Sequence, residues 1–178
     1  MRRPSIGCLV FIVFYFLVFN ALGKEGLKMG ELKISSSVFE NNGSIPKKCT
    51  CDGTDVSPPL KIENVPSEAK SLALIVDDPD APVGTWVHWI LWNIPPETKE
   101  VKEGSVPEGS QQGTNDFKKQ TYGGPCPPSG THRYFFKLYA LDSLLNLNPR
   151  STKADLEKAM KGHILSQAQV VGLYKRSK

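Results

Sequence analysis

The chain has 178 residues, of which 39% are hydrophobic and 22% are charged, a composition typical of one globular domain with a substantial core. Its net charge is +4, and much of the basic excess lies at the two ends, in Arg2, Arg3 and residues 175–178. The sequence has no stripe of basic residues with interleaved aromatic residues, so it disfavours a nucleic-acid partner.

The N-terminal segment differs in character from the rest of the chain. Arg2 and Arg3 precede an apolar run, residues 6–23, that has no charged residue and ends in an Ala-x-Gly sequence. This pattern is typical of a secretory signal peptide, although the run is also nearly long enough to be an uncleaved membrane anchor. Residues 1–23 are therefore predicted to be a signal peptide or an anchor. Residues 24–178 are predicted to be a single exported domain, either periplasmic or extracellular, or tethered to the membrane by that anchor.

Three cysteines follow the targeting segment, namely Cys49, Cys51 and Cys126. An oxidising compartment favours one disulfide and one free thiol. Cys49 and Cys51 are too close for a relaxed mutual bridge, which makes Cys126 the natural partner of one of them. Three reduced thiols are the alternative if the domain faces a reducing space. Three cysteines without a nearby pair of histidines do not favour a zinc site, and no metal or other cofactor is expected.

The first half of the domain begins with short elements and leads to a buried strand. Residues 31–46 contain short apolar stretches around an Asn-Asn-Gly turn signal, which predicts strand, turn and strand. Residues 50–66 are rich in Gly, Pro and Asp and predict a loop. Residues 71–78 form a continuous apolar run that ends in two aspartates, and this run suits a strand buried on both faces.

Two further strands are predicted over residues 85–95 and 133–142, separated by a polar, irregular segment over residues 96–122. Strict alternation would place one set of side chains on a common face of the first strand, namely Trp86, His88, Ile90 and Trp92. On the second strand the same rule gives a face with His132, Tyr134, Phe136 and Leu138, whose opposite face carries Arg133, Phe135 and Lys137.

The C-terminal part contains the one helix that the sequence predicts with clear boundary signals. In residues 151–163, Thr152 precedes Asp155 by three residues, as in a capping box, and Gly162 stands where a helix commonly ends. Residues 168–176 then predict a final strand. The architecture is mainly β with a C-terminal helix, because strands do not alternate with helices as in a doubly wound α/β fold.

Polar residues capable of binding a ligand follow or interrupt these strands. In the Asp-Asp-Pro-Asp-Ala-Pro sequence, the proline restricts Asp78 to an extended conformation and presents Asp80 at the tip of a turn. An ordinary turn, in which an aspartate bonds its own backbone, is the alternative. His88 and His132 lie within or beside aromatic strands, where a histidine is more often part of the core than a ligand-binding residue. Residues 123–134 hold glycines and prolines that fix a loop in one shape.

Three of these motifs together resemble the phosphatidylethanolamine-binding protein family, which includes the Raf kinase inhibitor-like proteins. They are DDPDAP, VHWILWNIP and YGGPCPPSGTHRYFFKLYALD, and the sequence CDGTDVSPPL resembles the bacterial and archaeal branch. The resemblance covers nearly all of residues 30–175. It implies a large central β-sheet with a smaller sheet beside it, and a small pocket for anions such as phosphate or acetate. Carried over to this sequence, the pocket comprises Asp78, Asp80, His88, Gly124, Pro127, Pro128, His132 and Tyr134.

The resemblance also implies roles for these residues. The prolines would form a rigid wall, the histidines would donate to an anion, and the aspartates would fix the histidine tautomers or bind a cationic head group. Because both loops lie on the pocket side in the family, Cys51 is predicted to pair with Cys126. Cys49 would then be the spare thiol, and we expect it to be exposed.

The favoured function is non-enzymatic binding of a small anionic or phosphorylated ligand, such as phosphate or a phospholipid head group. The alternative is an inhibitor or regulator of another protein, and an exported domain fits a protease better than a kinase. A hydrolase is disfavoured because no nucleophile is convincing: Ser129 has no nucleophile-elbow context, and Cys126 is flanked by prolines. Contact with a membrane is expected only through the N-terminal segment.

Overall fold

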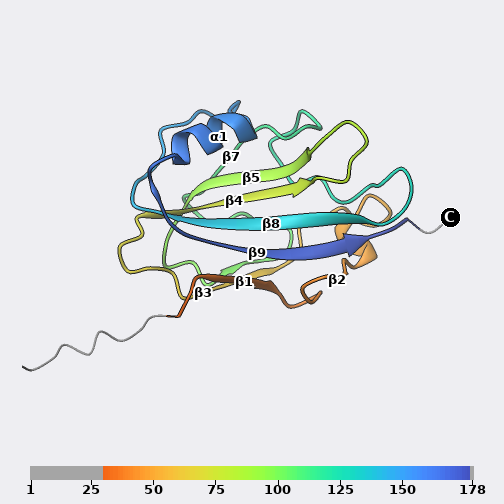
Figure 1. Ribbon diagram of the computed structural model, residues 1–178, viewed down its shortest axis with the longest axis horizontal. Helices are drawn as coiled ribbons and strands as arrows, with labels where there is room; N and C mark the ends of the chain where they lie inside the picture. The colour runs from red at the N-terminus through yellow and green to blue at the C-terminus, as the bar shows by residue number, and fades with distance from the viewer. Residues whose placement is uncertain (1–29, 177–178) are drawn as a thin grey trace, which may run out of the picture.

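The computed structural model describes residues 30–176, so the predicted signal peptide or anchor lies outside the described part of the chain. Within this part the chain forms a six-stranded sheet, a three-stranded sheet and one α-helix (Figure 1). This confirms the predicted architecture of a large sheet, a smaller sheet and a helix near the C-terminus. In residues 30–176 no helix is long and apolar enough to cross a lipid bilayer.

The large sheet has the strand order β2-β9-β8-β4-β5-β7. Its strands are β2 (Gly43–Ser44), β4 (Ser71–Asp78), β5 (Trp86–Ile94), β7 (Gln111–Gln112), β8 (His132–Leu141) and β9 (Ile164–Tyr174). Neighbouring strands are antiparallel except for β2, which runs parallel to β9. The small sheet is antiparallel and consists of β1 (Lys33–Ser36), β3 (Leu60–Glu63) and β6 (Glu100–Val101).

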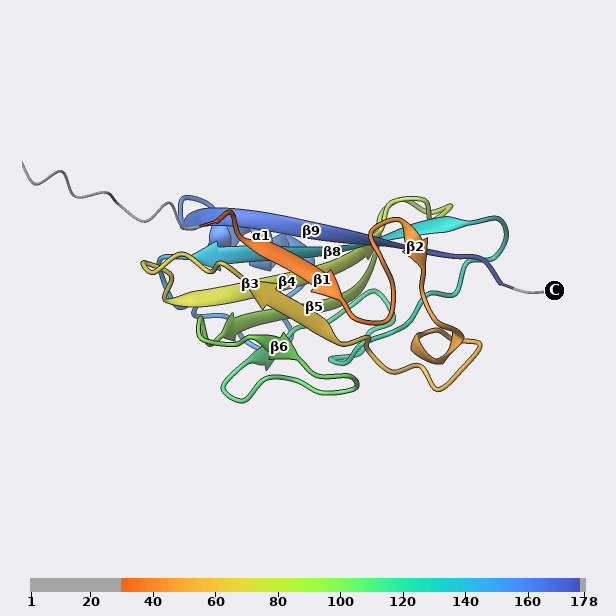
Figure 2. The ribbon, with the colours of Figure 1, turned by 90° about the horizontal axis from the view of Figure 1, so that it is seen from below.

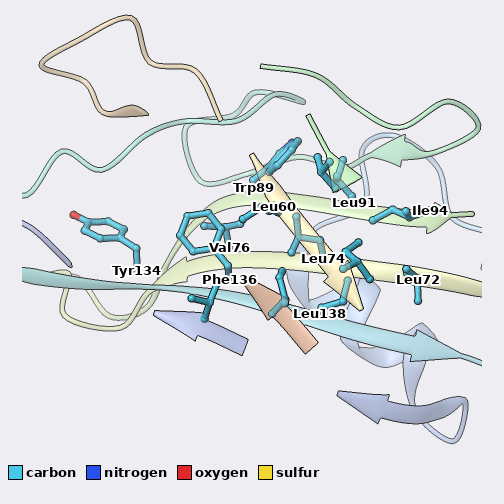
Figure 3. Packing of buried hydrophobic residues seen from close by; sticks show 14 of the residues in the cluster. Leu60, Leu72, Leu74, Val76, Trp89, Leu91, Ile94, Tyr134, Phe136 and Leu138 are labelled. Atoms are coloured by element: carbon cyan, nitrogen blue, oxygen red, sulfur yellow. The ribbon is translucent and has the colours of Figure 1, made fainter. Parts of the chain in front are cut away.

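The core lies on both faces of the large sheet. Every residue of β4 is buried, as the continuous apolar run predicted. One face of the large sheet packs against the small sheet, whose strands cross those of the large sheet in Figure 2. The buried side chains between the two sheets form one hydrophobic cluster, and Figure 3 shows part of it. The other face packs beneath α1 (Lys153–Met160), through buried Leu156 and Met160. The strands at the centre of the sheet are therefore fixed from two sides.

The predicted boundaries of α1 agree with the structure. The Thr152 side chain accepts a hydrogen bond from the Asp155 N–H, and the Asp155 carboxylate accepts one from the Thr152 N–H, which completes the capping box. Gly162 follows the helix with a φ of 85°, a left-handed conformation that glycine adopts readily. The final strand begins at Ile164 rather than at residue 168, because it pairs with the whole length of β8.

Several short strands differ from the prediction. The segment 31–46 contains the two predicted strands, but β1 pairs with β3 and β2 pairs with β9 instead of with each other. β3 forms within the predicted loop 50–66, and the short strands β6 and β7 form within the predicted irregular segment 96–122. Each of these strands has at most four residues and forms by pairing with a distant segment, which local propensity does not indicate.

The alternation predicted for β5 is wrong from His88 onward. His88 is the extra residue of a β-bulge, because its two neighbours pair with successive residues of β4. Its ring meets Tyr134 of the cluster beneath the small sheet, whereas Ile90 and Trp92 belong to the cluster beneath α1. On β8 the predicted alternation is confirmed, with buried side chains at His132, Tyr134, Phe136 and Leu138.

Candidate functional site

A cavity of about 230 Å³ opens where β4 ends and where β5 and β8 begin. This end of the sheet receives a short turn after β4 and the proline-rich loop before β8. Of the eight residues predicted for the pocket, six line this cavity, namely Asp78, His88, Pro127, Pro128, His132 and Tyr134. The fold therefore brings together residues that are up to 56 positions apart in sequence (134 − 78).

The bulge in β5 turns His88 toward this cavity. The Nδ1 atom of His88 lies 2.6 Å from the carbonyl oxygen of Gly123. A carbonyl oxygen can only accept, so Nδ1 carries the proton and Nε2 is the ring nitrogen left for a ligand. The rings of Phe117 and Tyr134 meet the imidazole edge-on, at centroid distances of 5.4 and 5.2 Å. Burial lowers the pKa of His88, so its neutral form is favoured in the folded protein.

His132, the first residue of β8, is held by the last residue of β4. Its Nδ1 atom lies 2.7 Å from the Asp78 Oδ2 atom, which leaves Nε2 as the ring nitrogen for a ligand. The other Asp78 oxygen accepts a hydrogen bond from the Asp80 N–H at 2.8 Å. Asp78 thus combines two roles that the sequence offered as alternatives. It forms the local turn and also orients a histidine.

Asp80 is placed differently from the prediction. It does not line the cavity, and its carboxylate instead binds Arg133, the residue after His132. It accepts from the Arg133 N–H at 2.9 Å, from Nε at 2.9 Å and from Nη2 at 2.7 Å. These bonds lower the pKa of Asp80 to about 2. The carboxylate is therefore engaged by a cation of the protein itself, and it joins the turn after β4 to the start of β8.

Gly124 also lies outside the cavity lining and acts in the loop that carries the prolines. Its N–H donates to the Asp55 Oδ1 atom at 2.6 Å. A Cβ atom at this position would lie 2.6 Å from the carbonyl oxygen of Cys49, so a larger residue would push the loop away. The Cys51 N–H donates to the Pro125 carbonyl at 3.1 Å. Hydrogen bonds thus join the proline-rich loop, at Gly124 and Pro125, to the segment that follows β2.

The predicted disulfide between Cys51 and Cys126 is confirmed, with 5.4 Å between the two Cα atoms. Cys126 lines the cavity directly before Pro127, so the bridge fixes the wall at the pocket itself. Within residues 30–176 Cys49 is the free thiol, as predicted, but the expectation that it is exposed is wrong. Its side chain is fully buried, because the short 3-10 helix Lys47–Cys49 packs it into the core beneath the small sheet.

Tyr134 contributes a buried hydroxyl group to the cavity. Its ring is 1% exposed, and its hydroxyl lies beside the Asp78 carboxylate and the Cys126 N–H without a well-aligned hydrogen bond to any residue of 30–176. In Figure 3 this oxygen lies at the outer end of the cluster, pointing away from the other labelled side chains. Burial, followed by the nearby charge of Asp78, raises the pKa of Tyr134, so the phenol remains protonated. The hydroxyl is therefore a donor available to a ligand.

Apolar residues that the sequence did not indicate complete the cavity and its mouth. They are Ala81, Pro82, Val83, Trp86 and Phe117, together with the bridged Cys126. Phe117 is held near β5 because the carboxylate of the neighbouring Asp116 accepts a hydrogen bond from the Val87 N–H at 2.7 Å. Phe117 is the one phenylalanine of the mainly polar segment 96–122, and this is the signal that would have identified it.

The cavity has no permanent positive charge in its lining. Its titratable residues are Asp78, His88, His132 and Tyr134, and Arg133 is directed to Asp80 instead. No lysine or arginine therefore supplies positive charge to the cavity. The described residues also contain no group of acidic, cysteine or histidine side chains suited to a metal ion.

Comparisons with known proteins bear on the family and on the fold as a whole. The family model of the phosphatidylethanolamine-binding proteins matches residues 35–175. The chain is 51% identical over 150 residues to a UPF0098 protein of Methanothermobacter thermautotrophicus, and the match covers 82% of this chain and 99% of that protein. It is 50% identical over 185 residues to a UPF0098 protein of Pyrococcus horikoshii, with 97% and 92% covered.

Two solved structures are similar in fold. A phosphatidylethanolamine-binding protein homologue from Chlamydia trachomatis has a TM-score of 0.80 and 41% identity, and the match covers 83% of this chain and 99% of that one. The E. coli protein YbcL, described as a member of the mammalian family, has a TM-score of 0.78 and 29% identity, with 83% and 100% covered. The sequence match over most of the chain, together with these folds, shows that the chain belongs to the phosphatidylethanolamine-binding protein family.

Proposed function

We propose that the protein binds a small anion in this pocket, such as inorganic phosphate or the phosphate group of a larger molecule, and does not convert it chemically. The observation that carries this proposal is the convergence of His88 and His132. Each ring has its Nδ1 atom held by the protein, which leaves its Nε2 atom for the ligand. The unpartnered Tyr134 hydroxyl adds a third donor to the same cavity.

Binding of this kind is coupled to proton uptake. Burial favours the neutral form of His88, which has an acceptor at Nε2, and an acceptor facing an anion is unfavourable. Protonation converts Nε2 into a charged donor, and charge-assisted hydrogen bonds are roughly twice as strong as neutral ones. The lining supplies no lysine or arginine, so the histidines are the source of positive charge.

A binding role without catalysis is supported by the state of the possible nucleophile. Cys126 is the cysteine in the cavity lining, and its sulfur is bridged to Cys51. A bridged sulfur is not a thiolate and does not attack a substrate. The pocket thus presents donors and an apolar wall, which are features that suit recognition.

Calorimetric titration with inorganic phosphate tests the proposal. The unchanged protein should bind, whereas His88→Ala and His132→Ala should bind at least tenfold more weakly. His163→Ala is the matched control, because His163 is the other histidine of the described chain and pairs with Asp142 outside the pocket. Equal phosphate binding by all three variants and the unchanged protein would refute the pocket assignment.

We also propose that the domain works outside the cytoplasm. The basic and then apolar start of the sequence supports export, and so does the exposed disulfide between Cys51 and Cys126. Disulfides persist mainly in oxidising compartments. The ligand would accordingly be an anion present in the periplasm or the extracellular space.

A further inference from the structure

The large apolar side chains that are exposed lie at opposite ends of the large sheet. Within residues 30–176 there are five of them, and Val83 and Phe117 belong to the mouth of the pocket. The other three are Leu144, Ile164 and Leu165, with exposed fractions of 67%, 44% and 43%. The pocket explains the first pair, whereas the second group has no role in the proposed anion site.

Hydrogen bonds and strand register place this second group at the end of the sheet remote from the pocket. Ile164 pairs with Leu141, where β8 ends, and Leu144 follows three residues later. The N–H of Lys70, the residue before β4, donates to the carbonyl oxygen of Leu141 at 2.8 Å. The start of β4 therefore lies beside the end of β8. The pocket lies where β4 ends, and the eight residues of β4 span about 25 Å at roughly 3.3 Å per residue.

The chain enters the domain at this same end. The Glu31 carbonyl accepts a hydrogen bond from the Asn64 side chain at 3.1 Å, and Asn64 directly follows β3 on the way to the start of β4. Figures 1 and 2 both show the beginning of β1 and the beginning of β9 at one end, with the marked C-terminus at the other. Residue 30 therefore lies at the end that exposes the three apolar side chains.

The sequence before residue 30 supplies a reason for apolar side chains at this end. The uncharged apolar run ends at residue 23, and the six residues 24–29 reach at most about 20 Å when fully extended. If the run inserts into a bilayer, this end of the domain is held close to the lipid.

We propose that the end bearing Leu144, Ile164 and Leu165 docks on the surface of the lipid bilayer that holds residues 6–23. The pocket then opens on the far side of the domain, about 25 Å from the docked end at the spacing of a β-strand. Building on the proposed anion site, this orientation assigns the pocket a ligand from the aqueous phase. It excludes a lipid head group of the same bilayer as the ligand.

Two matched labels test this orientation in the full-length chain. Leu144→Cys and Val83→Cys place a reactive thiol at exposed apolar positions of opposite ends, 67% and 79% exposed in the unchanged protein. Both variants also carry Cys8→Ser, so that the cysteine of the apolar run takes no label. The remaining native cysteines do not compete, because Cys49 is buried and the other two form the disulfide. Each variant is labelled with an environment-sensitive dye and reconstituted into vesicles of phosphatidylcholine and phosphatidylglycerol that contain a nitroxide-labelled lipid.

The lipid quencher should reduce the emission of the label at position 144 several-fold more than that of the label at position 83. Equal quenching at the two positions, stronger quenching at position 83 or no quenching at either would each overturn the proposed orientation. Adding Ile164→Gln and Leu165→Gln to the Leu144→Cys chain should lower its quenching, because both side chains are exposed and belong to the docking end. Unchanged quenching in this variant would show that the apolar side chains do not hold the domain on the lipid.

The orientation and the proposed function can fail separately. Phosphate binding is measured by calorimetry on the unchanged protein without lipid, so it does not depend on how the domain sits on a membrane. If phosphate binds and the lipid quencher acts mainly at position 83, the pocket is an anion site that faces the bilayer. If the label at position 144 is quenched and phosphate does not bind, the proposed orientation on the membrane is supported and the proposed anion binding is refuted.

Discussion

At the scale of single residues, His88 should affect both the stability of the empty protein and the affinity of the pocket for an anion, with opposite dependences on pH. Burial lowers the pKa of His88 below its ordinary value. The unfolded chain therefore takes up a proton at a pH where folded His88 is still neutral. The free energy of unfolding should fall as pH decreases from about 6.5, the ordinary pKa of histidine, toward the lower pKa of the folded state. His88→Ala should reduce this dependence, as measured by urea unfolding at several pH values.

The affinity for an anion should change in the opposite sense. If protonated histidines are the donors, anion binding takes up protons, and the affinity falls as pH rises. Sulfate is a suitable probe because it does not titrate near neutral pH, so a change in its affinity reports on the protein. Calorimetry in buffers of different ionisation enthalpy would give the number of protons taken up. A sulfate affinity that stays constant or rises with pH would contradict donation by the imidazolium form.

Tyr134 allows a ligand-binding role to be separated from a structural one. Its hydroxyl is buried beside Asp78 without a well-aligned hydrogen bond, a state that is costly in the empty protein. Tyr134→Phe should leave the free energy of unfolding unchanged or slightly raise it. Phosphate affinity should fall by about threefold to tenfold, which corresponds to a net hydrogen bond of about 0.5–1.5 kcal/mol. Loss of stability together with unchanged affinity would show that the hydroxyl supports the fold and does not contact the ligand.

At the scale of elements, regular sequence patterns predicted the strands that carry the site, whereas the irregular features of these strands were not predicted. The apolar run of β4 and the alternation of β8 placed Asp78 and His132 at strand ends. The bulge that turns His88 toward the cavity was not predictable, because an extra residue is defined only by the register with the neighbouring strand. The partner of Asp80 was not predicted either, because Arg133 is 53 positions away in sequence. A carboxylate at a turn could equally line the pocket or bind a neighbouring cation.

The family resemblance added what periodicity could not supply. It grouped three motifs from separate strands and loops, and it indicated the pairing of Cys51 with Cys126, which the structure contains. It did not indicate Phe117, which reaches the pocket from a polar segment without a recognisable motif. It also said nothing about the burial of Cys49, which depends on how the short 3-10 helix packs beneath the small sheet.

The disulfide gives a prediction for the proline loop as an element. The bridge closes a loop of 75 residues, and removing it should lower the free energy of unfolding by about 4 kcal/mol according to the chain-entropy relation. Phosphate affinity should fall as well, because Cys126 is part of the pocket wall. The measurement compares the oxidised protein, the reduced protein and the double variant Cys51→Ser, Cys126→Ser. The double variant is the control, since a reductant should not change it further. Unchanged affinity after reduction would show that backbone hydrogen bonds alone hold the wall.

At the scale of the whole molecule, the two ends of the large sheet carry different parts of the chain. The side chains that line the cavity, the proline-rich loop and the disulfide lie where β4 ends, whereas Glu31 lies at the end where β4 begins. Antiparallel pairing of long strands produces this separation, because it places the starts of β5 and β8 beside the end of β4. A domain attached by its N-terminal segment would consequently present its pocket away from the attachment point.

Export of the whole molecule can be tested through the same disulfide. Ile12→Asp and Phe16→Asp place two charges in the apolar run of residues 6–23 and should prevent its recognition as a targeting segment. In cells that produce this double variant, the protein should remain in the cytoplasm with Cys51 and Cys126 reduced, because cytoplasmic thiols are kept reduced. The unchanged chain should fractionate outside the cytoplasm and give a cross-linked Cys51–Cys126 peptide in non-reducing mass spectrometry. Arg176→Ala provides a control at the other end of the chain, since Arg176 pairs with Asp52 and should not affect export. The same cytoplasmic fraction for the unchanged chain and the double variant would refute export and would leave the disulfide to be explained by a different oxidising environment.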